Sequence, residues 1–173
     1  MRRRTALAVA AVGAILLAAP AVIDPRPRLI WNASASVPVG LYRASRAENL
    51  RVGDLVAVAP PPDLATFLAD RGYLPRGVPL LKHVAALSGS VVCRDAAIVA
   101  IDGRSTAAAR ERDRRNRPLP VWSGCRTITA NEVFLLNPDA TDSFDGRYFG
   151  ALPRDAVTAR LTPIWIAANA DDP

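Results

Sequence analysis

The chain has 173 residues, half of them apolar, so it is long enough for one domain with a hydrophobic core and too apolar for a disordered chain. The net charge is +6, and much of the arginine falls in two clusters. The first cluster, residues 2–4, precedes an apolar segment, as the positive-inside bias predicts for a cytoplasmic N-terminus. The second, residues 110–117, contains Glu111 and Asp113 and no aromatic residue. It is typical of a solvated loop, and we expect no nucleic-acid partner.

Residues 5–23 carry no charge and are rich in Ala, Val, Leu and Ile. As a helix this segment spans roughly 28 Å, enough to cross a bilayer. A cleaved signal peptide is the competing interpretation, since small residues precede Pro20. Because that proline makes cleavage beside it unfavourable, we predict an uncleaved transmembrane anchor. The expected domains are 1–24, a cytoplasmic stub and anchor, and 25–173, an extracytoplasmic body.

The segment 32–42, with the sequence NASASVPVGLY, follows the predicted anchor. If it is extended, Ser34 and Ser36 point to the same side and can direct two hydroxyls into one cleft. Pro38 favours extended backbone before it, and Gly40 permits a bend. A linker after the anchor is the alternative interpretation, because Ser, Ala, Pro and Gly are ordinary linker residues.

The rest of the chain alternates short apolar runs with turn residues, which predicts strands. The expected strands, in chain order, are 55–58, 80–87, 91–93, 98–101, 121–122, 133–136, 157–161 and 164–166. The pair Asp102-Gly103 predicts a hairpin turn. One short body helix, 64–71, is expected, with Asp63 as its N-cap. The pattern indicates a mainly β, antiparallel body, an open barrel or sandwich.

Two cysteines, Cys93 and Cys125, bound an excursion of about 93–125, in which residues 104–117 are the most polar and are expected to be exposed. Their spacing fits neither a CxxC redox pair nor a zinc site. If the body is exported, a disulfide between them is the natural expectation, with two buried free thiols as the alternative. No histidine or cysteine cluster has the spacing of metal ligands, and we expect no metal or cofactor.

Two catalytic arrangements can be built from these residue types. A Ser-His-Asp triad depends on His83, the single histidine, whose candidate carboxylate partners are Asp54, Asp102, Asp139, Asp142 and Asp145. Lys82 and His83 are neighbours in a predicted strand, so only one of them can face a buried serine. A serine–lysine dyad needs a neutral amine, and the apolar residues around Lys82 can lower its pKa by burial. The alternative for Lys82 is a snorkelling lysine at a sheet edge.

Three segments occur in order: Ser36-Val37-Pro38, residues 81–89 (LKHVAALSG) and residues 142–150 (DSFDGRYFG). Together they resemble the three signature boxes of the type I signal peptidase family, which uses a serine–lysine dyad. The Ser-x-Pro-x-Gly-x-Tyr form, the paired cysteines and Asn32 are more similar to the conjugative-transfer branch, the TraF-type pilin-processing peptidases. The resemblance extends from the anchor to Trp165.

The resemblance implies a role for particular residues. Ser36 matches the nucleophile and Lys82 the general base. The hydroxyl of Ser34 joins the Ser36 backbone N–H in an oxyanion hole, and Ser143 orients the lysine amine. The remaining matches, Asp145 and Arg147, are a supporting ion pair, and we expect its role to be structural. Val37 and Gly146 depart from the family, where Met and Ser are usual.

The resemblance further implies a membrane-anchored serine endopeptidase with its N-terminus in the cytoplasm and its catalytic domain in the periplasm. The expected partners are the lipid bilayer and an exported precursor, such as a conjugative prepilin, cleaved after small residues at −1 and −3. Hydrolysis of the acyl-enzyme and cyclisation of the pilin both stay open. The alternative functions are an inactive membrane-tethered scaffold of a conjugation or secretion apparatus, and a basic DNA-handling accessory.

Overall fold

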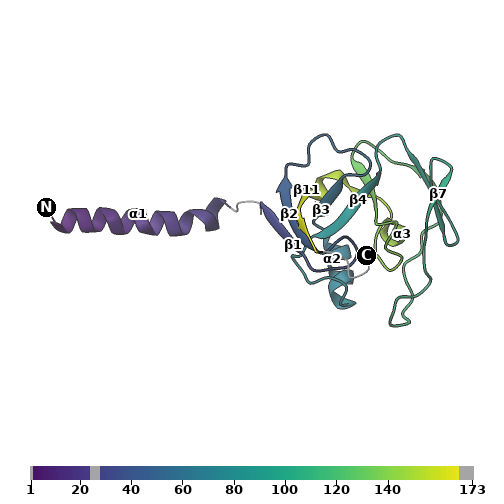
Figure 1. Cartoon of the computed structure of the whole chain (residues 1–173), viewed down its shortest axis with the longest axis horizontal. Helices are drawn as coiled ribbons and strands as arrows, with labels where there is room; N and C mark the ends of the chain where they lie inside the picture. Colours follow the sequence, from purple (N-terminus) through teal and green to yellow (C-terminus); the bar gives the residue numbers. More distant parts are fainter. Residues whose placement is uncertain (1, 24–27, 168–173) are drawn as a thin grey trace.

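The computed structural model describes residues 2–23 and 28–167. An N-terminal helix, α1 (Arg2–Ile23), precedes a body built from two antiparallel sheets (Figure 1). No helix within these two ranges combines the length and the hydropathy of a membrane crossing. The predicted domain boundary, at residues 24 and 25, lies outside the described residues.

The larger sheet has seven strands in the order β1-β2-β11-β3-β4-β9-β10, and each neighbouring pair is antiparallel. Its strands are β1 (Leu29–Asn32), β2 (Gly40–Ser45), β3 (Leu55–Val58), β4 (Leu80–Ala86), β9 (Glu132–Leu136), β10 (Leu152–Pro153) and β11 (Val157–Ile166). Strand β11 comes last in the chain but lies between β2 and β3. The mainly antiparallel β body predicted from the sequence is confirmed.

The smaller sheet has four strands in the order β7-β6-β5-β8, and it is formed by the chain between β4 and β9. Its strands are β5 (Val91–Asp95), β6 (Ile98–Ile101), β7 (Arg104–Ala108) and β8 (Gly124–Thr127). Cys93 and Cys125 lie directly opposite each other on β5 and β8 and form a disulfide. The bond therefore closes the base of the excursion.

Within residues 28–167 the body contains three short helical segments, where the sequence predicted one. They are α2 (Pro62–Asp70), α3 (Gly146–Phe149) and the 3-10 turn η1 (Arg154–Ala156). The prediction that Asp63 caps α2 is wrong, because Pro61 is the N-cap and Asp63 lies in the first turn. A proline at the first helical position needs no hydrogen-bond acceptor for its nitrogen, and the carboxylate of Asp63 complements the helix dipole from inside the turn.

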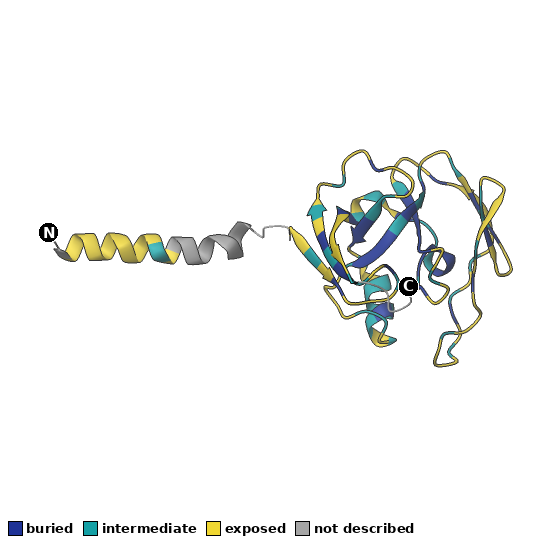
Figure 2. Cartoon of the chain, viewed as in Figure 1, coloured by how far each residue is buried: buried dark blue, intermediate teal, exposed yellow. Residues whose placement is uncertain are grey.

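The hydrophobic core lies on both faces of the central strands, which Figure 2 shows as dark blue. Val56 and Val58 pack in one cluster, whereas Ala57 between them packs in another. Since successive strand residues point to opposite faces, β3 is covered on both sides. This explains why β3 reads as a continuous apolar run instead of an alternating one.

Several element predictions are confirmed and others need correction. The strands at 55–58 and 98–101 are β3 and β6, and Asp102 and Gly103 form the predicted turn with φ of 50° and 77°. The two strands expected at 157–161 and 164–166 are one strand, β11, with a register shift beside Pro163.

The strand expected at 121–122 is wrong. Trp122 instead donates from its indole Nε1 to the Gly146 carbonyl at 3.0 Å, and its ring meets Phe134 edge-on. The side chain thereby ties this segment to α3, and the neighbouring strand, β8, begins at Gly124. The polar segment 104–117 is mostly exposed, as predicted, and it starts with β7.

Candidate active site

The serine-bearing segment is a tight loop between β1 and β2, and it is not extended as predicted. The backbone turns at residues 34–37. The side-chain amide of Asn32 donates to the carbonyls of Ser34, Val37 and Pro38 at 2.8, 3.0 and 3.0 Å. A buried asparagine that satisfies backbone carbonyls in this way replaces the sheet ladder with a local turn.

The turn still brings the two hydroxyls together. Ser34 Oγ lies 3.3 Å from Ser36 Oγ, and it donates to Asn32 Oδ1 at 2.8 Å. The backbone N–H of Ser34 donates to the same Asn32 oxygen at 3.0 Å. The two hydroxyls are thus paired by a turn that Asn32 organises, and not by the strand alternation predicted from the sequence.

Gly40 serves close packing rather than the predicted bend. It is the first residue of β2, and a Cβ added there would collide with the backbone carbonyl of Trp165 on β11. Tyr42 stabilises the same region, since its hydroxyl donates to the Pro38 carbonyl at 2.6 Å. The serine turn is therefore fixed against both of its neighbouring strands.

Lys82 lies on β4, in the interior of the larger sheet, with 3% of its surface exposed. Burial lowers the pKa of its amine from 10.5 to about 8, because a buried ammonium loses its hydration. The charge of Asp145 raises this pKa and that of Arg147 lowers it, both less than burial does. The snorkelling alternative does not describe this side chain, because Lys82 is neither exposed nor on an edge strand.

The amine of Lys82 donates a hydrogen bond to Ser143 Oγ at 2.7 Å. Ser143 itself is buried and sits in the loop between β9 and α3. This contact fixes the direction of the lysine side chain while leaving the lone pair of a neutral amine available to another donor.

Asp145 and Arg147 form an ion pair at 2.9 Å, with side chains 0% and 2% exposed. The carboxylate also accepts hydrogen bonds from the backbone N–H groups of Asn137 and Arg147. The guanidinium donates to the carbonyls of Ala140 and Ser143 at 2.7 and 3.2 Å. The ion pair therefore holds together the loop that carries Ser143. This is a structural role.

Asn137, for which the sequence predicted no role, contacts the backbone on both sides of Lys82. Its amide donates to the Leu81 carbonyl at 3.1 Å, and its side-chain oxygen accepts from the His83 backbone N–H at 3.2 Å. It thus brackets Lys82 on β4 and connects that strand to Asp145. The His83 ring also contacts the Asn137 oxygen, at 3.1 Å. In the described part of the chain, His83 has no hydrogen bond to a serine or an aspartate, so no triad forms around it.

One pocket of about 680 Å³ is lined by the residues that the sequence predicted to be catalytic. Its lining includes Ser34, Ser36, Lys82 and Ser143. Among the hydrogen bonds of the described residues, none joins Ser36 directly to Lys82. Asp145 and Arg147 are not among its lining residues, and the disulfide lies in the other sheet. The described side chains contain no cluster that could hold a metal ion.

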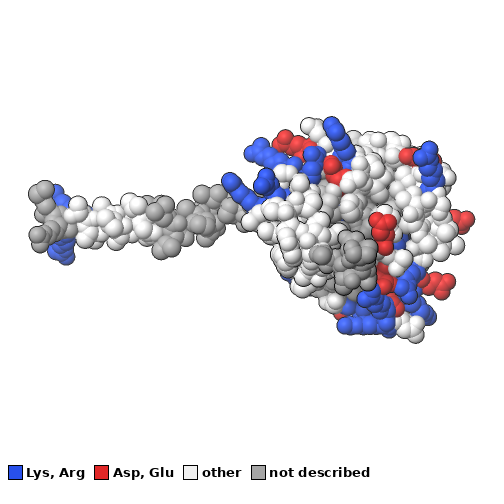
Figure 3. All heavy atoms as spheres, viewed as in Figure 1, with Lys and Arg blue, Asp and Glu red and all other residues white. Residues whose placement is uncertain are grey.

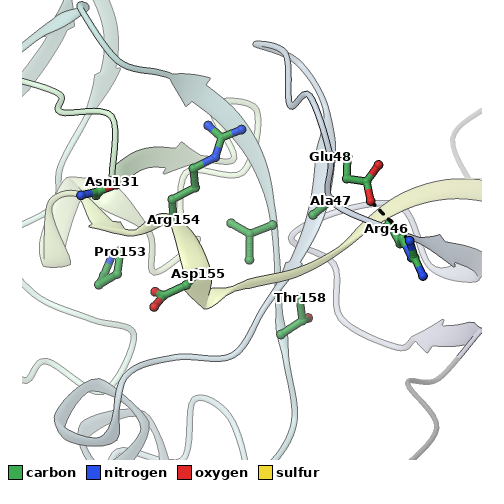
Figure 4. Close-up of a pocket in the computed structure, with 9 residues that line it drawn as sticks. Arg46, Ala47, Glu48, Asn131, Pro153, Arg154, Asp155 and Thr158 are labelled. Carbon is green, nitrogen blue, oxygen red and sulfur yellow. Dashed lines mark ion pairs between the residues drawn. The ribbon is translucent and has the colours of Figure 1, made fainter.

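A second, larger pocket of about 1000 Å³ shares no lining residue with the first. Figure 4 shows Arg46 and Glu48 on one side, joined by an ion pair of 3.7 Å, and Arg154 and Asp155 on the other. The lining residues of this second pocket include no lysine.

Similarity to known proteins assigns this chain to a family. Residues 1–166 match the family model described as signal peptidase, peptidase S26. The plasmid transfer protein TraF of Escherichia coli is 32% identical over 167 residues, which cover 90% of this chain and 91% of that protein. The conjugal transfer protein TraF of Agrobacterium tumefaciens (strain 15955) is 35% identical over 178 residues, covering 95% and 98%.

Among solved structures, the chain is similar to a signal peptidase I from Enterococcus faecalis V583. The TM-score is 0.40 at 19% identity, over 68% of this chain and 100% of that one. The match to the family model and the identities to the TraF proteins place the chain: it belongs to the signal peptidase family S26. Within this family it is a TraF-type member.

Proposed function

We propose that this protein is a membrane-anchored serine endopeptidase in which Ser36 and Lys82 form the catalytic dyad. The observation that carries the proposal is the environment of Lys82: a buried amine, with a pKa lowered to about 8, lines the same pocket as Ser36. A lysine becomes a general base only when such burial makes its neutral form available near physiological pH.

The proposed reaction is acyl transfer. Ser36 Oγ attacks the scissile carbonyl carbon, and its proton passes to Lys82 Nζ. The carbonyl oxygen becomes an oxyanion that the Ser34 hydroxyl and the Ser36 backbone N–H stabilise. When the C–N bond breaks, the leaving amine takes the proton from Lys82 and an ester to Ser36 remains.

A second nucleophile then releases Ser36. Attack by water gives hydrolysis. Attack by the amine of the substrate's own terminus gives a cyclic product, whose mass is lower by one water molecule than that of the hydrolysed product. In either case Lys82 accepts the proton of the attacking group and passes it to Ser36 Oγ as the ester bond breaks, which restores the starting dyad. The substrate would enter as an extended strand along an exposed sheet edge. Strand β1 is such an edge, and it ends at Asn32, beside the serine turn.

Support for the membrane anchor comes from the sequence and from one surface feature. Residues 5–23 carry no charge and follow three arginines. Five residues, 24–28, separate this segment from β1, where Trp31 stacks on Trp165 at 5.8 Å with 58% and 53% of their surfaces exposed. Exposed tryptophans suit a membrane–water interface, because their rings are apolar and their N–H groups are polar. The catalytic body would then lie on the periplasmic side.

The proposed substrate is an exported precursor such as a conjugative prepilin, cleaved after small residues. The similarity to proteins named for plasmid and conjugal transfer supports this choice. A tethered, inactive scaffold of the same apparatus is the competing function.

The test is processing of a co-expressed prepilin by the full chain and its variants. Ser36→Ala and Lys82→Ala are each expected to abolish cleavage, whereas the control Ser105→Ala, an exposed serine on β7, leaves it intact. Circular dichroism of each purified variant shows whether the body is folded. Cleavage that persists in folded Ser36→Ala or Lys82→Ala protein refutes the proposed dyad, and absence of cleavage in the wild type favours the scaffold.

A further inference from the structure

Residues 111–119 form a small, ordered hairpin, called the arginine hairpin below, where the sequence predicted a solvated loop. The backbone N–H of Leu119 donates to the Glu111 carbonyl at 2.8 Å, and Arg112 pairs with Pro118 in an antiparallel bridge. At the tip, the Asp113 carboxylate accepts from the backbone N–H groups of Arg115 and Arg117 at 2.9 Å each. The turn that presents the arginines is therefore held by its own aspartate.

The hairpin is fastened to the end of α2. Tyr73 donates from its hydroxyl to Asp113 at 2.5 Å, and Arg71 donates to the Pro118 carbonyl at 2.7 Å. The Arg117 side chain donates a hydrogen bond to the Arg71 carbonyl at 3.0 Å, and its guanidinium lies over the Tyr73 ring. In Figure 1 the chain after β7 runs down beside α2, and Figure 3 shows basic and acidic atoms gathered along that lower edge of the body. The hairpin thus has a fixed place on the surface.

The hairpin forms one wall of the pocket that contains Ser36 and Lys82. Six arginines and three aspartates line this pocket, namely Arg71, Arg110, Arg112, Arg114, Arg115, Arg117, Asp113, Asp139 and Asp142. Two aspartates are already engaged: Asp142 pairs with Arg110 and Arg114, and Asp113 pairs with Arg117.

Arg112 and Arg115 differ from the other arginines of the hairpin. Among the described residues, neither has a carboxylate partner. Arg112 donates only to the Asn116 carbonyl, at 2.8 Å, and the Arg115 side chain reaches toward Gly72 without a hydrogen bond in the described part of the chain. A guanidinium carries five N–H donors in a planar fork that matches a carboxylate. These two side chains are exposed cations in a cleft of net positive charge.

We propose that the cleft selects substrates carrying a glutamate or aspartate side chain near the scissile bond, which Arg112 and Arg115 bind. The inference rests on the proposed function, because it places the substrate backbone at Ser36. A peptide carboxylate is favoured over an anionic lipid because these arginines line the pocket that holds the reacting hydroxyl, rather than forming a separate surface. The proposal thus assigns specificity to a segment outside the three signature boxes.

The test uses matched peptides with small residues at −1 and −3 that differ only by Glu or Gln at one position, scanned over four residues on each side of the scissile bond. We expect Glu at one position to raise kcat/KM of the full chain at least about tenfold over Gln, as charge-assisted bidentate bonds do. In Arg112→Gln/Arg115→Gln protein this ratio falls to about one. Arg104→Gln, an exposed arginine of β7, is the matched control that keeps it. Raising the salt concentration reduces the ratio by screening.

Binding of the same peptides to Ser36→Ala protein separates this proposal from the proposed function. If no peptide is cleaved by the wild type but the Glu peptide binds Ser36→Ala more tightly in an Arg112/Arg115-dependent way, the dyad fails and the selectivity stands. Equal affinity and equal cleavage of Glu and Gln peptides at every position overturn the selectivity alone. Loss of binding to phosphatidylglycerol vesicles in the double variant, without any Glu preference, would assign the arginines to lipid and also overturn it.

Discussion

Neutralising Asp145 by Asp145→Asn tests whether the buried ion pair holds the site together. The change leaves the Arg147 guanidinium, 2% exposed, without its countercharge. Arg147 keeps its bonds to the Ala140 and Ser143 carbonyls but loses two charge-assisted bonds of 2.9 Å, from Nε and from Nη2. Breaking one side of a buried ion pair costs about 3–5 kcal/mol. We expect a loss in the free energy of unfolding within this range.

The assay is urea unfolding of the full chain in detergent at pH 7, followed by tryptophan fluorescence. Asp142→Asn is the matched control, because Asp142 pairs with Arg110 and Arg114, whose side chains are 52% and 79% exposed. Each exposed pair contributes less than about 1 kcal/mol, so this variant should lose much less stability than Asp145→Asn. Equal and small losses in both variants would refute the structural part assigned to Asp145.

The same variant has a predictable effect on the proposed base. The charge of Asp145 raises the pKa of Lys82, whereas burial, the largest cause, lowers it to about 8. Removing the carboxylate therefore lowers the pKa further, and the pH at which activity is half-maximal moves down. An upward shift in folded protein would contradict this electrostatic assignment.

The other predictions concern Lys82, Gly146 and the disulfide. Lys82→Met raises the free energy of unfolding at pH 7 by up to about 3 kcal/mol, since the pKa falls from 10.5 to about 8 on folding. Folding lowers the pKa of Lys82, so burying its charged form costs the wild type the full free energy below pH 8. This cost disappears as the pH rises toward 10.5, and the stability that Lys82→Met gains over the wild type shrinks over the same interval. Gly146→Ala lowers the thermal midpoint by the equivalent of about 1–3 kcal/mol, since its Cβ would lie 2.7 Å from the Leu135 carbonyl oxygen. Replacing Cys93 and Cys125 by serine lowers the free energy of unfolding by roughly 3–4 kcal/mol, because the bond closes a loop with a sequence separation of 32.

Each of these predictions has a contradicting result. A Lys82→Met variant less stable than the wild type at pH 7 would mean that the amine is well solvated. An unchanged midpoint in Gly146→Ala protein would mean that the β9–α3 contact yields easily. An equal free energy of unfolding in the double serine variant and the wild type would show that the disulfide does not stabilise the fold.

The sequence predicted the parts of the fold that depend on local pattern. Continuous apolar runs located β3 and β6, and the Asp102-Gly103 pair located a turn that needs positive φ. The strand expected around Trp122 failed because a distant partner, the Gly146 carbonyl, decides where that side chain lies. Long-range packing of this kind leaves no periodic signal.

The sequence supplied candidate site residues but not their geometry. The two serines were expected to be paired by strand alternation, whereas the Asn32 amide folds them into a turn. Asn137 was missed because hydrogen bonds to the backbone of a neighbouring strand require the register of β4 against β9. A signal for Lys82 was nevertheless available, since it is the only lysine in the chain and lies in an apolar segment.

That single lysine makes the central claim directly measurable. The full chain, prepared with isotopically labelled lysine, gives one side-chain amine environment, and its Cε chemical shift is followed by nuclear magnetic resonance from pH 6 to 11. We predict a titration midpoint near pH 8, with the peptidase rate rising along the same curve. A midpoint near 10.5, the ordinary value of a solvated lysine, would contradict the account.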